Sequence, residues 1–217
     1  MARQTFHQEL REIEESVIQM AALVEREVAR AIQALSQRDT VLATEIVSSD
    51  DEVNEFQRSI RSRCIAVMAL QAPVARDLRE LITVQLVINE LERMGDHAVG
   101  IAKQTMRIRE YEPIPTMEKL IHISNLVVEQ IRLGIQSFVD INVQQAREVC
   151  ERDDEIDAQY RAAFTELIEI MSKDSSRVQP ATSLLFAAHD LERIGDRVTN
   201  ICEDVIYMVT GEIEELN

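Results

Sequence analysis

Two short segments with the same acidic pattern lie one hundred residues apart in this chain of 217 residues. The first reads LERMGDHAVGI from Leu91 to Ile101, and the second reads LERIGDRVTNI from Leu191 to Ile201. Each copy carries a Glu and an Asp four residues apart: Glu92 and Asp96, then Glu192 and Asp196. Side chains four apart share one face of a helix, and like charges at that spacing repel each other. The pattern therefore favours a cation site in each copy.

A glycine stands inside each acidic pair, at Gly95 and Gly195, although the chain has only five glycines. Glycine in the middle of a helix is about 1 kcal/mol less favourable than alanine. Two of five glycines at the same helical position therefore indicate a requirement of packing or of the site.

A second acidic segment is also repeated, as DDEVNEFQRSI from Asp50 and DDEIDAQYRAAF from Asp153. Both aspartates interrupt an apolar stripe that leans inward, where a carboxylate is costly unless it is paired or bound to a cation. In each half the midpoint between the two acidic segments falls on the turn between them, so a hairpin places them level. We expect Asp50 and Asn54 to lie near Glu92 and Asp96.

The ligands of such a site are all oxygen, without His or Cys. Oxygen ligands suit hard or borderline cations such as Mg²⁺, Ca²⁺, Mn²⁺ or iron better than structural zinc, and several close carboxylates suit more than one ion. The alternative is a network of interhelical salt bridges in which Arg93 and Arg193 supply the positive charge. This alternative stays open at the level of the sequence.

An enzyme is the next alternative. A ferritin-like di-iron site requires Glu-x-x-His motifs, and no histidine of the chain has a Glu three residues before it. A phosphorelay role for His97 or His189 has little support, because any exposed histidine on a helix looks the same. The chain lacks GxxxxGK[ST], GxSxG and GxGxxG motifs and shows no nucleophile with its base. Three classes remain open: a metal-binding signalling adaptor, a carboxylate-metal enzyme, and a purely structural helical bundle.

The composition excludes several partners. The formal charge of −16, from 39 acidic against 23 basic residues, repels phosphate backbones, so nucleic-acid binding is not expected. The N-terminus has charges throughout, and no stretch approaches the ~18 uninterrupted apolar residues of a membrane span. These features predict a cytosolic protein without direct membrane insertion. The odd count of three widely spaced cysteines, Cys64, Cys150 and Cys202, predicts reduced thiols in the core.

The elements that position the acids are long helices. Five breaker stretches divide the chain into six segments with helical periodicity: Ser36–Asp39, Ala69–Pro73, Tyr111–Pro115, Val139–Asn142 and Lys173–Pro180. Short loops make sequential helices antiparallel neighbours. We therefore predict an all-α fold of six long helices that form two pseudo-symmetric antiparallel three-helix bundles. The two repeats span residues 1–112 and 113–217.

The repeated segments carry a family resemblance. ERMGDHAVGIA and ERIGDRVTNIC, together with PVARDLREL from Pro73, closely resemble the PhoU family of phosphate-signalling proteins over nearly the whole chain. The resemblance implies two symmetry-related three-helix bundles and, as in some family members, multinuclear clusters of iron or another metal held by E/DxxxD motifs. Iron is the favoured ion, with manganese, zinc, magnesium and calcium as alternatives. The implied ligands are Asp50, Asn54, Glu92 and Asp96 in the first half, and Asp153, Asp157, Glu192 and Asp196 in the second.

The first half departs from the family pattern at two positions. Asn54 stands where a carboxylate is expected, and Gly100 stands where the second half has Asn200. We therefore expect the first site to bind more weakly or differently. The ARDLR run from Ala75 to Arg79 has only a faint echo at Ser176 and Arg177, which makes a partner contact there one-sided.

Membership of this family further implies an accessory regulator rather than an enzyme. Such a protein couples the phosphate-specific ABC transporter to a sensor histidine kinase and represses the phosphate-starvation response when phosphate is ample. The resemblance also implies a homodimer that stays in the cytoplasm and reaches the inner membrane through its partners.

Overall fold

The computed structural model describes the backbone of residues 2–216 and the side chains of residues 6–216. All regular elements in this range are helices. They are α1 (Ala2–Gln37), α2 (Thr40–Gln71), α3 (Ala75–Ile108), α4 (Met117–Val139), α5 (Val143–Glu151), α6 (Asp153–Lys173), the 3₁₀ helix η1 (Ser175–Arg177) and α7 (Val178–Thr210). The predicted all-α fold is confirmed.

Capping side chains show that the duplication includes the turns. The carboxylate of Asp39 caps α2 by accepting hydrogen bonds from the backbone N–H groups of Val41 and Leu42, at 3.0 and 2.9 Å. Asn142 caps α5 in the same way through Gln145, at 3.1 Å. Side-chain caps satisfy backbone donors that a helix start leaves free. The two caps are 103 residues apart, which is also the separation of Asp50 and Asp153.

The fifth predicted segment differs from the prediction because the structure interrupts it at Arg152. This residue ends α5 with a tight turn, in which its N–H donates to the Val149 carbonyl at 3.2 Å. Three acids then occupy the first turn of α6, where the helix dipole favours negative charge. The same Asp-Asp-Glu triplet, at residues 50–52, lies inside the continuous helix α2. The helix is therefore interrupted in the second half only, although both halves have the same acidic triplet at this position.

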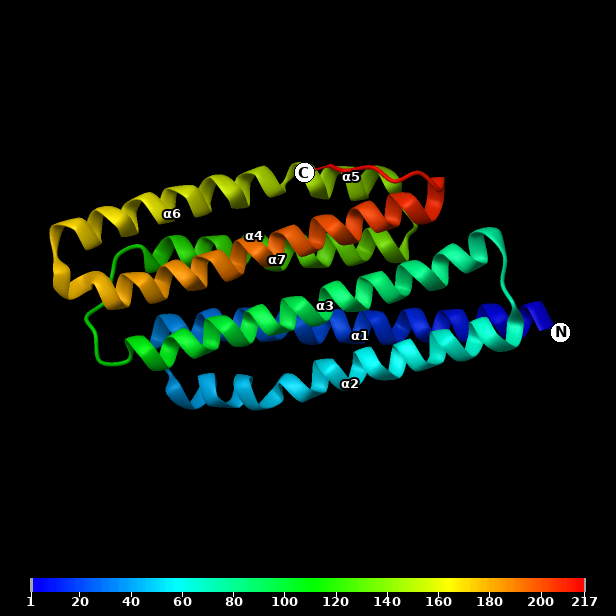
Figure 1. The fold of residues 1–217 in the computed structure, drawn as a ribbon, viewed down its shortest axis with the longest axis horizontal. Coiled ribbons are helices and arrows are strands. Elements are labelled where there is room, and N and C mark those ends of the chain that lie inside the picture. The colour runs from blue at the N-terminus through cyan, green and yellow to red at the C-terminus, as the bar shows by residue number, and fades with distance from the viewer. Residues whose placement is uncertain (1, 217) are drawn as a thin grey trace.

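The two halves pack side by side (Figure 1). Helices α1 to α3 form the first unit, and α4 to α7 form the second. In Figure 1, α3 and α7 run antiparallel through the middle of the molecule, while α2 and α6 lie at opposite edges. Helix α3 packs against α7 and α1 packs against α4, so the two units share one body.

The core consists of apolar stripes that follow the helical periodicity. The α1 stripe from Phe6 to Leu35 is buried, as are the matching stripes of α3 and α7 around Gly95 and Gly195. Burying a large apolar side chain contributes about 1.5 to 3 kcal/mol. The helices keep a polar outer face. None in the described part of the chain is both long and apolar enough to cross a bilayer.

The three cysteines are buried free thiols, as predicted. Burial raises the pKa of the Cys64 thiol to about 11. A hydrogen bond with Cys150, together with burial, also raises the pKa of Cys202. Because the thiolate is the reactive form, these two cysteines act as core residues rather than as nucleophiles.

Polar side chains mark the seam between the two halves. Glu90 accepts hydrogen bonds from Arg197 Nη1 at 3.3 Å and from Asn200 Nδ2 at 3.2 Å. At the symmetry-related position, His97 Nδ1 lies 3.0 Å from Asp190 Oδ1. Both contacts join α3 to α7. At both positions of the seam, an acidic side chain of one half therefore faces a basic side chain of the other half.

The difference between Gly100 and Asn200 belongs to this seam. A methyl group at Gly100 would lie 2.6 Å from Asp190 Oδ2, so glycine leaves room for that carboxylate. Asn200 instead donates to Glu90 across the seam. The structure thus places the difference between Gly100 and Asn200 at the seam and outside the acidic cluster. The sequence analysis had linked this difference to a weaker first site.

The ARDLR run forms the first turn of α3 and ties the halves together. Arg79 Nε donates to the Met208 carbonyl at 3.1 Å, near the end of α7. A cation there is favoured because the last carbonyls of a helix carry partial negative charge. Arg79 therefore makes a contact within the chain, and the second half has Gln179 at the matching position.

Candidate cation site

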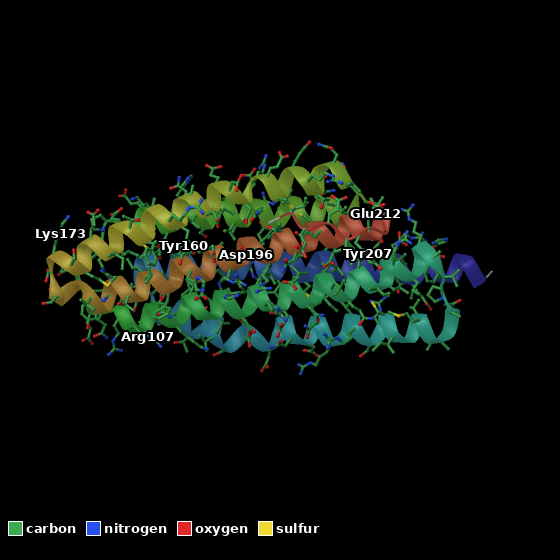
Figure 2. The ribbon with its side chains drawn as sticks, turned by 45° about the horizontal axis from the view of Figure 1, so that its top comes forward. Arg107, Tyr160, Lys173, Asp196, Tyr207 and Glu212 are labelled. Carbon is green, nitrogen blue, oxygen red and sulfur yellow. The ribbon has the colours of Figure 1, made fainter. Side chains whose placement is uncertain are left out.

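The candidate site consists of one acidic cluster in each half. The first acidic cluster is Asp50, Asn54, Glu92 and Asp96, and the second acidic cluster is Asp153, Asp157, Glu192 and Asp196. Each joins the second long helix of its half to the third. Figure 2 shows Asp196 on α7 and Tyr160 on α6 well away from Lys173, which lies at the tip of their hairpin.

The structure brings the members of the first acidic cluster within electrostatic range. Burial, followed by the charge of Asp96, raises the pKa of Asp50 and also that of Glu92. Asn54 Nδ2 donates to Asp50 Oδ2 at 3.3 Å. The amide that replaces a carboxylate therefore supplies a hydrogen bond to its neighbour.

The second acidic cluster is more buried and more strongly perturbed. Asp153 is only 7% exposed. Burial raises its pKa to about 6, and the charges of Asp196 and Asp157 act in the same direction. Burial and the charge of Asp196 also raise the pKa of Glu192 to about 6. Nearby positive charge would favour the ionised form of these carboxylates, so the cluster has the electrostatics of a candidate cation site.

A third helix contributes a polar residue to each half, which the sequence analysis did not identify. Gln130 on α4 is 2% exposed, and its Nε2 donates to Asp153 Oδ1 at 3.0 Å. Glu27 on α1 is 4% exposed and stands 103 residues earlier, at the same repeat position. A polar residue beside an apolar stripe is the signal that singled out Asp50 and Asp153. On α1 and α4 this signal is ambiguous, because several polar residues flank each stripe and neither helix carries an acidic repeat.

The paired glycines allow close approach at the clusters. A methyl group at Gly195 would lie 2.8 Å from Asp153 Oδ1 and 3.4 Å from Gln130 Oε1. At Gly95 it would lie 3.3 Å from Val53 Cγ1. The requirement indicated by the sequence is therefore steric. In the second half, the glycine leaves space for two side-chain oxygens.

Two buried oxygens of the second half have no hydrogen-bond partner, namely Gln130 Oε1 and Glu192 Oε2. An unsatisfied buried acceptor costs about 1 to 3 kcal/mol. Such an acceptor is explained when a donor or a cation occupies the site. The donor set and these free oxygens fit an oxygen-liganded cation.

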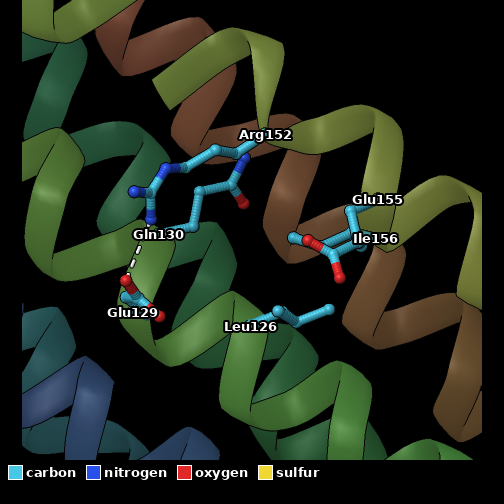
Figure 3. Close-up of a pocket in the computed structure, with 6 residues that line it drawn as sticks. All are labelled: Leu126, Glu129, Gln130, Arg152, Glu155 and Ile156. Atoms are coloured by element: carbon cyan, nitrogen blue, oxygen red, sulfur yellow. Dashed lines mark hydrogen bonds and ion pairs between the residues drawn. The ribbon is translucent and has the colours of Figure 1, made fainter. Parts of the chain in front are cut away.

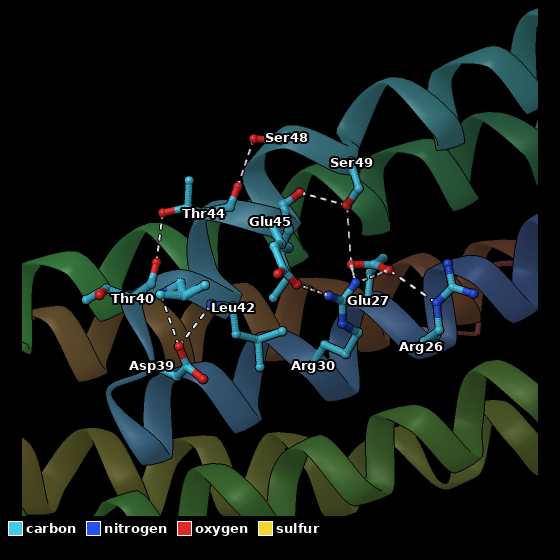
Figure 4. Close-up of polar contacts among 12 residues, drawn as sticks. Arg26, Glu27, Arg30, Asp39, Thr40, Leu42, Thr44, Glu45, Ser48 and Ser49 are labelled. Atoms are coloured by element: carbon cyan, nitrogen blue, oxygen red, sulfur yellow. Dashed lines mark hydrogen bonds and ion pairs between the residues drawn. The ribbon is translucent and has the colours of Figure 1, made fainter.

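In the first half, Glu27 is neutralised by neighbouring residues (Figure 4). Arg30 Nη1 donates to Glu27 Oε1 at 3.0 Å, and Arg26 Nε donates to the same oxygen at 3.3 Å. Ser49 Oγ donates to Glu27 Oε2 at 3.5 Å. The first half therefore supplies positive charge to its buried third-helix residue, Glu27.

The corresponding region of the second half is an open pocket of about 380 Å³ between α4 and α6 (Figure 3). Arg152 Nη1 forms an ion pair with Glu129 Oε1 across it, at 2.9 Å. Its other lining residues are Leu126, Gln130, Glu155 and Ile156. Glu129 takes the place of Arg26, and Arg152 pairs with Glu129 rather than with the buried third-helix residue.

Arginines do pair with some cluster carboxylates, as in the salt-bridge alternative. Arg193 Nη1 donates to Asp196 Oδ2, and Arg161 Nη1 donates to Asp157 Oδ2 at 2.9 Å. Asp153 and Glu192 have no such partner in the described chain. As placed in residues 6–216, no three His, Cys, Asp or Glu side chains converge closely enough to hold a metal ion. Holding an ion thus requires the carboxylates to draw together.

Fold and site together define a duplicated, all-helical protein with an acidic cluster in each three-helix unit. The model of the PhoU domain matches the chain twice, at residues 17–105 and 120–205. The chain belongs to the PhoU family. The two matches lie one in each structural unit.

Curated relatives match over the full length. A phosphate-specific transport system accessory protein PhoU homolog of Clostridium acetobutylicum is 37% identical over 218 residues, covering 100% of both chains. A homolog with the same name from Streptococcus pneumoniae is 33% identical and covers 99% of this chain and 100% of its own.

Solved structures share the fold. The crystal structure of PhoU from Pseudomonas aeruginosa superposes with a TM-score of 0.90 at 31% identity, covering 95% of this chain and all of that one. The phosphate transport system regulatory protein PhoU from Streptococcus pneumoniae gives a TM-score of 0.91 at 31% identity, with coverages of 97% and 99%.

Proposed function

We propose that this protein is a metal-binding accessory regulator of phosphate transport. In this role it couples the phosphate-specific ABC transporter to a sensor histidine kinase and represses the phosphate-starvation response when phosphate is ample. The full-length relationship to phosphate-specific transport accessory proteins carries this proposal. The protein acts as an adaptor rather than as an enzyme. It works as a cytoplasmic homodimer that docks at the inner membrane through its partners.

The metal part of the proposal rests on the second acidic cluster. Gln130 is buried with a free carbonyl oxygen, and Glu192 Oε2 is also free. Oxygen donors from α4, α6 and α7 surround Gly195, where the helices approach closely. A metal ion or a multinuclear cluster, with iron favoured, supplies the missing charge and links the three helices.

The regulatory role is tested in cells. Deleting the gene is expected to switch on a phosphate-starvation reporter in excess phosphate, and the wild-type gene is expected to restore repression. A reporter that stays silent in the deletion strain contradicts the role. Pull-down of the transporter and the kinase with the protein as bait then tests the coupling.

The metal is tested on purified protein. We expect elemental mass spectrometry of untagged protein, purified without chelator, to find stoichiometric metal. The double variant Glu192→Ala/Asp196→Ala loses the metal of the second cluster, and the matched variant Glu92→Ala/Asp96→Ala tests the first. Circular dichroism checks that both stay helical. A folded wild type without metal returns the carboxylates to the salt-bridge alternative.

A further inference from the structure

The second acidic cluster includes a histidine that the sequence analysis set aside. His189 precedes Glu192 by three residues on α7, so both lie on one face of that helix. Its Nδ1 lies 3.4 Å from Glu192 Oε2, and its side chain is 51% exposed. The Glu-x-x-His motif of di-iron sites does not include this reversed His-x-x-Glu order. The cluster thus has a nitrogen donor at its rim.

Aromatic residues of α6 hold the imidazole in place. The rings of Tyr160 and His189 have centroids 6.1 Å apart, and Phe164 packs edge-on against Tyr160 at 6.3 Å. Aromatic pairs at these separations are favourable. A side chain that is fixed before binding loses less conformational freedom when it takes up a ligand. The contact with Tyr160 therefore preorganises His189 next to Glu192.

The oxygens around this histidine are not satisfied by the chain itself. Glu192 Oε2 has no hydrogen-bond partner, although His189 is its nearest base. Gln130 on α4 is buried beside Gly195, and its Oε1 is also free. Free acceptors on two helices indicate that a positively charged ligand completes the cluster.

The first half lacks all of these features. Asn89 takes the place of His189, and its Oδ1 accepts hydrogen bonds from Gln57 Nε2 at 3.2 Å and from Arg61 Nη2. Gln57 and Arg61 stand at the repeat positions of Tyr160 and Phe164. The amide oxygen is therefore occupied, and the arginine adds a positive charge beside Glu92. This arrangement disfavours a cation with nitrogen ligation.

We propose that His189 is a nitrogen ligand of the cation at the second acidic cluster. This proposal rests on the proposed metal-binding function. Imidazole suits ions such as Fe²⁺ and Zn²⁺, Mn²⁺ accepts it beside its preferred oxygen ligands, and Mg²⁺ and Ca²⁺ take oxygen ligands. The second cluster therefore selects transition-metal ions over Mg²⁺ and Ca²⁺. The first cluster offers oxygen ligands only and has no such preference.

The test is pulsed electron paramagnetic resonance of the full-length protein loaded with Mn²⁺. Nitrogen-14 modulation of the electron spin echo reports a coordinated imidazole directly. We expect this modulation in the wild type and in His122→Asn, which alters an exposed histidine of α4. We expect its loss in His189→Asn, which copies the residue of the first half. Calorimetric titrations with Mn²⁺ and with Mg²⁺ accompany the spectra.

The outcomes separate the inference from the function on which it rests. His189→Asn is expected to weaken Mn²⁺ binding by about 10- to 100-fold, as for removal of a group that supports a metal site, and to leave Mg²⁺ binding unchanged. Stoichiometric Mn²⁺ without nitrogen modulation in the wild type overturns the role of His189 alone. A wild type that binds no Mn²⁺ overturns the metal site itself.

Discussion

The two halves carry the same acidic register on three helices but neutralise it differently. In the first half, Arg26 and Arg30 surround the buried Glu27. In the second half, the buried Gln130 serves the equally buried Asp153, and a pocket opens beside it. Duplication thus preserved the packing, while the sources of positive charge diverged. Arginines thus neutralise the buried third-helix residue of the first half, whereas the second half has a neutral amide at that position.

The largest effect is expected when the buried residues of α4 and α1, Gln130 and Glu27, are exchanged. Gln130→Glu places a carboxylate beside Asp153 in a buried site, and an unpaired buried charge destabilises strongly. We expect it to lower the free energy of unfolding by roughly 3 kcal/mol, measured by urea denaturation, with partial recovery in Mn²⁺. Glu27→Gln is expected to cost about 1 kcal/mol, because Arg30 keeps its contact with Glu45. Equal losses in both variants refute the proposed difference.

The paired glycines give the next largest contrast. Gly195→Ala forces Asp153 away from Gln130, so the overpacking and the lost hydrogen bond outweigh the gain in helix propensity. We expect a loss of about 2 kcal/mol in thermal unfolding. Gly95→Ala meets only Val53 Cγ1 at 3.3 Å and is expected to change stability by less than about 1 kcal/mol. A larger loss of stability in Gly95→Ala than in Gly195→Ala would contradict the view that Gly195 is the more crowded position.

The two halves also differ in how their stability depends on pH. Asp204 on α7 titrates, whereas Gln104, the matching residue on α3, does not. Burial, with the charges of Glu90 and Glu203, raises the pKa of Asp204 to about 7. The fold therefore holds a proton that the unfolded chain releases above about pH 4. The stabilisation is present at low pH and is lost as the pH rises through 7.

We expect the free energy of unfolding of the wild type to fall between pH 5 and pH 8. Asp204→Asn is expected to remove about 1 to 2 kcal/mol of this fall, which is less than the full shift implies because the side chain is partly exposed. Gln104→Asn serves as the control, since it alters the equivalent position without a titrating group. An unchanged pH profile in Asp204→Asn contradicts the assignment.

The smallest effect concerns the arginines of the repeated motifs. Arg193 pairs with Asp196, so Arg193→Ala frees a candidate ligand and is expected to tighten Mn²⁺ binding about fivefold, equivalent to about 1 kcal/mol. Stability is expected to change by less than about 1 kcal/mol, because a partly exposed pair within one helix contributes little. Arg93→Ala provides the matched control in the first half. Calorimetry measures both, and weaker binding in Arg193→Ala makes this arginine a part of the site.

The fold was predictable because its signals are long and repeated. The apolar stripe of α1 extends from Phe6 to Leu35, and the caps at Asp39 and Asn142 fall inside predicted breakers. The break at Arg152 was not predictable, because the acidic triplet after it continues as helix in the other half.

The candidate site was predictable only in part. The spacing of the acids led to both clusters, since helical periodicity fixes which residues share a face. Gln130 and Glu27 were missed because each lies on a helix without an acidic repeat. Only helix packing brings Gln130 to Asp153 and Glu27 to Ser49, which precedes Asp50. His189 was missed because the search expected Glu before His. The metal ligands themselves stay a prediction.

The antiparallel seam between α3 and α7 also bears on how the chain acquired two different sites. In a pair of identical three-helix units, a change at Glu90 would appear on both sides of the axis at once, and both copies of each contact would have to tolerate it. The link from residue 109 to residue 116 joins the two units in one chain. Each side of the seam then accepts substitutions separately, so glycine can stand at Gly100 while asparagine stands at Asn200. Covalent linkage thus relaxes the symmetry constraint that a homodimer imposes on its own interface.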